Sequence, residues 1–110
     1  MSNRLSFRRY LREYISVPNF YFQPPENKKI SYPCIIYKTS RAETEHAGNI
    51  PYRITPIYEV VLVDQNPDSI HFSELLQVPK SRLIRTYEVD NLNHWVFQIH
   101  YNGTFPDINF

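Results

Sequence analysis

The segment Ile57-Tyr58-Glu59-Val60-Val61-Leu62-Val63 decides how the rest of the chain can fold. Successive side chains of a strand point to opposite faces, and both sets are apolar here except for Glu59. A short apolar run of this kind is typical of a strand in the middle of a sheet. We therefore expect this segment to be a central strand.

Four other segments also have the chemistry of strands, since they are rich in aromatic and β-branched side chains and are bounded by turn residues. The segment at the end of the series alternates with a two-residue period, so that its aromatic side chains share one face. The four segments are Asn19–Gln23, Tyr32–Lys38, Arg82–Glu88 and His94–Tyr101.

Two segments have helical spacing instead. Residues 6–16 place four apolar side chains on one helical face, with Ser6 as a candidate N-cap and Pro18 as the stop. Residues 69–78 carry a second, shorter apolar stripe that stops at Pro79, and Asn66 or Ser69 could cap it. The apolar residues of the two stripes are Phe7, Leu11, Tyr14, Ile15, Phe72, Leu75 and Leu76.

This order of elements predicts an α+β fold: a small, mostly antiparallel sheet with an N-terminal helix and a second short helix packed on one face. A chain of 110 residues fits one domain, which we place at 1–102, with 103–110 as a C-terminal tail. The segment Thr39–Pro56 is expected to be a long loop between the second and third strands. Loops of that length in compact domains are usually functional or disordered.

Composition excludes several classes of function. The net charge of +1 gives no sign of a polyanion partner. The chain has only two glycines, whereas loops that cradle phosphates need several, so we expect no nucleotide site. The first nine residues lack the apolar core of a signal peptide, and no apolar run is long enough to span a membrane. We therefore expect no membrane partner, and the single Cys34 suits a reducing compartment.

Metal and catalytic motifs are equally sparse. Residues 64–68 begin like a calcium loop, but the turn glycine and the final glutamate are missing. His94 and His100 share a strand face but stand about 20 Å apart, too far to bind one metal ion. Cys34 lies in an apolar strand, where a thiol usually acts as a small hydrophobe. We expect no cofactor, no metal and no enzymatic activity; a small hydrolase stays an alternative, because a triad can assemble from distant residues.

The one patterned charge feature is a set of arginines, Arg4, Arg8, Arg9 and Arg12, on the side of the first helix away from its apolar stripe. Such a face can be merely solvated, or it can bind an acidic partner or phosphates. The sequence leaves these alternatives open, and a nucleic-acid-binding accessory protein is one of the functions that they allow.

Four stretches of the sequence form a further pattern. They are Tyr32-Pro33-Cys34-Ile35-Ile36-Tyr37, Asn49-Ile50-Pro51-Tyr52, residues 58–69 from Tyr58-Glu59-Val60 to Asn66-Pro67-Asp68-Ser69, and Asp90-Asn91-Leu92-Asn93-His94-Trp95-Val96-Phe97. In this order and spacing they resemble the small tail-completion or tail-terminator proteins of the neck of tailed bacteriophages. The resemblance extends over most of residues 5–101, and the last two stretches carry its more specific part.

The resemblance implies a structural subunit without catalysis, which forms a ring, typically a hexamer, around a channel through which DNA later passes. Its implied partners are further copies of itself, the tail tube protein and the head connector or stopper, within a virion assembled in the host cytoplasm. Another head–tail connector, a stopper or a head-completion protein is the alternative. The candidate contact residues are Arg4, Arg8, Arg9, Arg12, Glu43, Glu45, His46, Asn49, Tyr52, Phe105 and Phe110.

Overall fold

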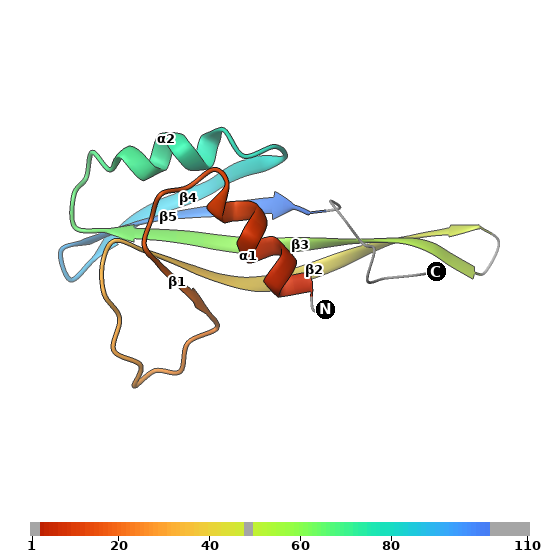
Figure 1. The fold of residues 1–110 in the computed structure, drawn as a ribbon, viewed down its shortest axis with the longest axis horizontal. Coiled ribbons are helices and arrows are strands. Elements are labelled where there is room, and N and C mark those ends of the chain that lie inside the picture. The colour runs from red at the N-terminus through yellow and green to blue at the C-terminus, as the bar shows by residue number, and fades with distance from the viewer. Residues whose placement is uncertain (1–2, 48–49, 102–110) are drawn as a thin grey trace.

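The computed structural model describes residues 3–47 and 50–101, and the side chains of residues 3–5 and 41–55 are not part of that description. The fold is α+β, as predicted (Figure 1). Its elements in chain order are α1 (Asn3–Arg12), β1 (Asn19–Phe22), β2 (Cys34–Ala47), β3 (Ile50–Asp64), α2 (Ile70–Leu76), β4 (Ser81–Val89) and β5 (Leu92–His100).

The strands form one five-stranded sheet in the order β1-β2-β3-β5-β4. The central position of β3 confirms the prediction made from its apolar character on both faces. All pairs are antiparallel except β1 with β2, which run parallel from the pair Asn19 and Cys34 to the pair Phe22 and Tyr37. β1 and β4 are therefore the two edges of the sheet.

The long connection predicted at Thr39–Pro56 does lie between β2 and β3, but most of its backbone is paired. The antiparallel ladder continues to the pair Ala47 and Ile50, with register shifts after Thr39 and Glu45. β5 pairs only with Ile57–Asp64 of β3, so the outer parts of β2 and β3 pair with each other alone. Figure 1 shows them as a two-stranded arm that extends beyond the rest of the sheet.

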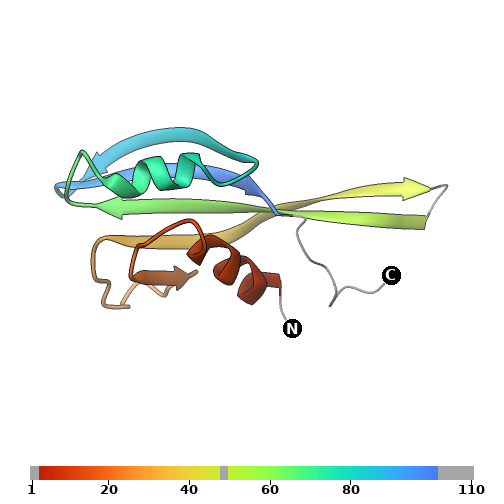
Figure 2. The same cartoon turned by 45° about the horizontal axis from the view of Figure 1, so that its top comes forward.

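Both helices cover the same face of the sheet, with α1 over β2 and β3 and α2 over β5 and β4 (Figures 1 and 2). We call this the helix face. Phe7 of α1 is fully buried there, and its ring stacks on Tyr58 of β3 with centroids 3.9 Å apart. The ring centroids of Tyr37 and Tyr101 lie 6.0 and 5.3 Å from that of Phe7. Burial raises the pKa of Tyr58 to about 12, so this phenol stays neutral.

The two helices start and stop for different reasons. Ser69 caps α2, since its Oγ accepts the backbone N–H of His71 at 3.3 Å, as the sequence allowed. The predicted first helix is confirmed, but its predicted bounds of 6–16 and its predicted cap at Ser6 were wrong, because α1 spans Asn3–Arg12 and Ser6 lies inside it. After Arg12 the chain leaves the helix in a tight turn, in which Ile15 N–H still bonds Leu11 O at 2.9 Å.

The second face of the sheet bears no helix in the described part of the chain. Its centre is nevertheless apolar, and four side chains there are at most 1% exposed: Cys34, Ile57, Val63 and Val96. The edge strand β4 differs, because every residue from Arg82 to Val89 is exposed and a bulge at Ile84 interrupts its ladder with β5.

The stacked ring of Phe7 should dominate the stability of the fold. Phe7→Ala removes a fully buried aromatic side chain, and we expect the free energy of unfolding to fall by about 3 to 5 kcal/mol in urea titrations. The matched control is Ile70→Ala in α2, where the side chain is 70% exposed and a change within about 0.5 kcal/mol is expected. Equal effects of the two substitutions would contradict this account of the core.

Candidate functional site

Three of the predicted contact residues have described side chains, and all three lie on α1. Arg8 and Arg9 lie on the outer side of α1, with Arg8 half-buried and Arg9 exposed. Arg12 has a local role, because its guanidinium lies 4.8 Å from the ring centroid of Phe20 in β1. The side chains of Arg4, Glu43, Glu45, His46 and Tyr52, and residues Asn49, Phe105 and Phe110 as a whole, lie outside the described residues.

A polar cluster joins the turn after α1 to α2. His71 Nδ1 lies 2.6 Å from Glu74 Oε1, and the Ser16 hydroxyl donates to Glu74 Oε2 at 3.1 Å. The Ser16 backbone N–H also donates to Glu74 Oε1 at 3.2 Å. In a hydrolytic triad the histidine lies between the serine and the acid. Here Ser16 Oγ, at 3.4 Å, and Glu74 Oε1 both approach His71 Nδ1, so the three side chains hold the two elements together, and we call them the clamp.

Glu74 carries the negative charge of this clamp, because the pKa of its carboxyl group is lowered. Partial burial by itself raises the pKa of the carboxyl group, but the hydrogen bonds from His71 and Ser16 outweigh it and hold the pKa below its usual value of 4.5. A carboxyl group with a lowered pKa stabilises the fold above its usual pKa, and this contribution is lost as the pH falls through the folded-state pKa.

Other residues that could carry chemistry are engaged in packing. Burial raises the pKa of the Cys34 thiol to about 12, which keeps it protonated and unreactive. The His94 ring stacks on Tyr87 with centroids 4.5 Å apart, and its Nδ1 lies 3.1 Å from Leu92 O. Within residues 3–47 and 50–101, no group of three His, Cys, Asp or Glu side chains is placed to hold a metal ion.

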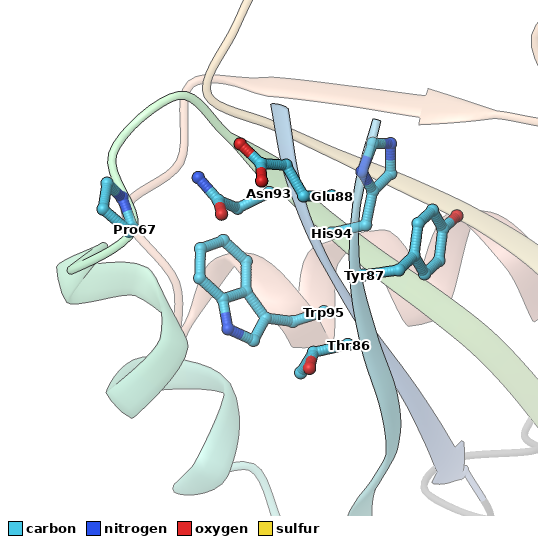
Figure 3. A pocket seen from close by; sticks show the side chains of 7 residues that line it. All are labelled: Pro67, Thr86, Tyr87, Glu88, Asn93, His94 and Trp95. Carbon is cyan, nitrogen blue, oxygen red and sulfur yellow. The ribbon is translucent and has the colours of Figure 1, made fainter. Parts of the chain in front are cut away.

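A hollow of about 310 Å³ lies where the β4–β5 hairpin meets the turn before α2, and Figure 3 shows the residues that line it. Two cross-strand pairs form its floor on the helix face, Thr86 with Trp95 and Glu88 with Asn93. Figure 3 shows these four side chains on the α2 side of the ladder, while Tyr87 and His94 point to the other side. Pro67 closes the hollow opposite the hairpin.

The walls of this hollow are held by specific contacts. Asn93 Nδ2 donates to Asp64 O and to Gln65 O, each at 3.3 Å, which ties β5 to the turn after β3. The Trp95 ring packs on Phe72 of α2 with centroids 6.0 Å apart. The turn itself contains two successive side-chain bonds, from Asn66 N–H to Asp64 Oδ1 at 3.0 Å and from Asp68 N–H to Asn66 Oδ1 at 2.9 Å.

The hollow lies at an acidic end of the molecule. Among the seven residues that line the hollow, Glu88 is the one with a formal charge, and Asp64, Asp68 and Asp90 belong to the two adjoining turns. Arg85 precedes Thr86 in β4, but it pairs with Val96 on the second face and lies over Tyr87. Residues 3–12, in contrast, contain four arginines and no acid. The contacts predicted from the sequence lie on the first helix, in the β2–β3 connection and in the C-terminal tail, and Glu88, Asn93 and Trp95 were not among them. The uneven distribution of charge along the chain was the signal that could have indicated them.

Comparison of the chain with protein-family models, with curated proteins and with solved structures finds no match. The phage-neck resemblance thus rests on the sequence stretches that carry it. Among the described residues, neither helix is long and apolar enough to cross a membrane.

The clamp should contribute to stability in a way that depends on pH. Glu74→Gln keeps the shape of the side chain but removes its charge, and we expect a loss of about 1 kcal/mol in unfolding free energy at pH 7. The contribution of the lowered pKa is complete above the ordinary value of 4.5 and is lost as the pH falls through the lower folded-state pKa, so the gap between wild type and variant should be smaller at pH 3 than at pH 7. Glu13→Gln, at an exposed position, is the control. A gap for Glu74→Gln that is the same at pH 7 and pH 3 would refute the clamp.

Proposed function

We propose that this protein is a structural subunit of a ring in the neck of a tailed bacteriophage. Within that neck we assign it to the tail terminator, which caps the tail tube and joins it to the head connector. Further copies of itself, the tail tube protein and the connector or stopper are its partners, and the virion is its location. The proposal starts from the four sequence stretches that resemble this family, and it assigns no catalytic role.

The observation that carries the proposal is the β2–β3 arm. The ladder between the two strands continues from Ala42 with Pro56 out to Ala47 with Ile50, and no residue of β1, β4 or β5 pairs with this part of it. The chain has a radius of gyration of 15.1 Å, against about 13 Å for a compact chain of this length. A two-stranded ribbon is marginal by itself in water, so a partner that packs against the arm gives it a reason to persist.

The mixed architecture favours the terminator over the other neck components. Connector adaptors are mainly helical and stoppers resemble small β-barrels, whereas this chain has an open five-stranded sheet with two helices on one face. Small α+β folds also occur in other parts of phage tails, so the fold supports the assignment jointly with the sequence resemblance.

The arrangement of basic residues weighs against the alternative of a nucleic-acid-binding accessory protein. Arg8 and Arg9 lie on α1, which covers the helix face, whereas Arg82 and Arg85 pair with Gln98 and Val96 on the second face. A nucleic-acid surface gathers its basic and stacking residues on one side. The described arginines are thus divided between two sides of the sheet.

The arm provides a direct test of ring formation. A variant in which residues 43–55 are replaced by Asn-Gly joins the paired residues Ala42 and Pro56 by a two-residue hairpin turn. It keeps Pro56, whose carbonyl accepts the N–H of Tyr101 at 3.0 Å, and it leaves the core intact. We expect this variant to fold and to remain monomeric in native mass spectrometry under conditions in which wild type forms closed rings.

Inactivation of the gene in its phage tests the place of the ring. Loss of a tail terminator should give tails of abnormal length in electron micrographs, and wild-type protein supplied from a plasmid should restore the normal length. Tails of normal length without the protein would exclude the terminator role. Rings formed equally well by the shortened variant would exclude the arm as the element that assembles them.

A further inference from the structure

We propose that the hollow between the β4–β5 hairpin and the turn before α2 receives the guanidinium group of Arg9 from a second copy of this chain. The contact would join the outer side of α1 in one subunit to the acidic end of the next. This inference rests on the proposed ring, and it adds to the arm a second contact through which neighbouring subunits meet.

The chemistry of the hollow fits a cation. Glu88 supplies an exposed carboxylate, and no ion pair of this side chain occurs among the described residues. The nitrogen of Asn93 is used in its bonds to Asp64 O and Gln65 O, which leaves the side-chain oxygen as an acceptor beside Trp95 (Figure 3). A carboxylate, an amide oxygen and an indole ring together favour a positively charged donor over an anion or a neutral apolar group.

An arginine fits this set of groups better than a lysine. The guanidinium is planar, so that it can stack on the indole of Trp95 while its N–H groups donate to Glu88 and Asn93. The same type of contact already occurs within the chain, where Arg12 lies over Phe20 at 4.8 Å and Arg85 over Tyr87 at 5.9 Å.

Charge complementarity points to a second copy as the source of the arginine. The acidic end around the hollow and the arginine-bearing α1 are separate surfaces of one molecule. Among the described arginines of α1, Arg12 is already packed on Phe20 and Arg8 is half-buried. Arg9 is exposed and makes no ion pair or hydrogen bond within the described chain, so its guanidinium is available.

The symmetry of such a contact agrees with a ring. A contact between two different surfaces of identical subunits is head-to-tail, so each subunit uses α1 on one side and the hollow on the other. Repetition of this contact closes into a ring when the rotation between subunits allows it. A two-fold dimer, in contrast, would place the same surface on both subunits.

The single tryptophan makes the contact measurable, because Trp95 is the only one in the chain and forms part of the hollow. The experiment follows the selectively excited emission of Trp95 as the concentration of full-length protein rises from about 1 μM to about 1 mM, the range of weak subunit contacts. We expect the emission of wild type to change with concentration and the change to weaken with added salt.

Charge reversal identifies the two partners. Arg9→Glu and Glu88→Arg should each lower the apparent association constant at least about tenfold, and the double variant should restore it to within about threefold of wild type. Arg82→Glu is the matched control, because it reverses an exposed arginine on the other face of β4 and should leave association nearly unchanged. Circular dichroism checks that each variant remains folded.

Methylguanidinium chloride provides an independent probe of the hollow. It should weaken the association of wild type more than sodium chloride does at equal ionic strength, since only the organic cation can stack on Trp95.

Three outcomes would overturn the inference: emission of wild type that is independent of concentration, single reversals that have no effect, or a double variant that stays as weak as the single ones. A wild type that forms rings through other contacts would leave the proposed function standing while refuting this contact. Tails of normal length in the absence of the gene product would instead refute the terminator role.

Discussion

The stacking of Phe7 on Tyr58 fixes the position of α1 on the sheet, and several distant features depend on that position. With Phe7 and Leu11 facing the sheet, Arg8 and Arg9 must point away from the core. The turn after α1 then carries Ser16 to Glu74, which links the first helix to the second. The placement of α2 in turn supports Trp95 through Phe72, so one aromatic contact indirectly positions both surfaces of the proposed subunit contact.

Much of the fold could be predicted because it follows from local patterns. The strand at His94–Tyr101 shows a two-residue period, the strand at Ile57–Val63 is a continuous apolar run, and the cap at Ser69 is local chemistry. The ends of α1 could not be predicted, because an apolar stripe marks the buried face of a helix and leaves its limits open. The arm was predicted as a loop because it has few apolar residues, yet a two-stranded ribbon is held by backbone hydrogen bonds, which every sequence offers.

The hollow was harder to foresee, since it depends on which residues face each other across a hairpin. Asp90 and Asn91 both have positive φ, 54° and 63°, and form the two-residue turn that fixes this register. The register places Glu88 opposite Asn93 and Thr86 opposite Trp95. The turn residues could be read in the sequence. The opposite wall contains Pro67, which precedes Glu88 by 21 residues and lies close to it only in the folded chain.

The exposed edge strand β4 also affects the chain before it assembles. An edge with free backbone groups and apolar side chains such as Leu83 and Tyr87 is a template on which identical chains can aggregate. Arg82 and Arg85 place charge along this edge, and the bulge at Ile84 breaks its regular spacing of donors and acceptors. Both features therefore oppose the growth of fibres through this strand when many identical chains meet at high concentration.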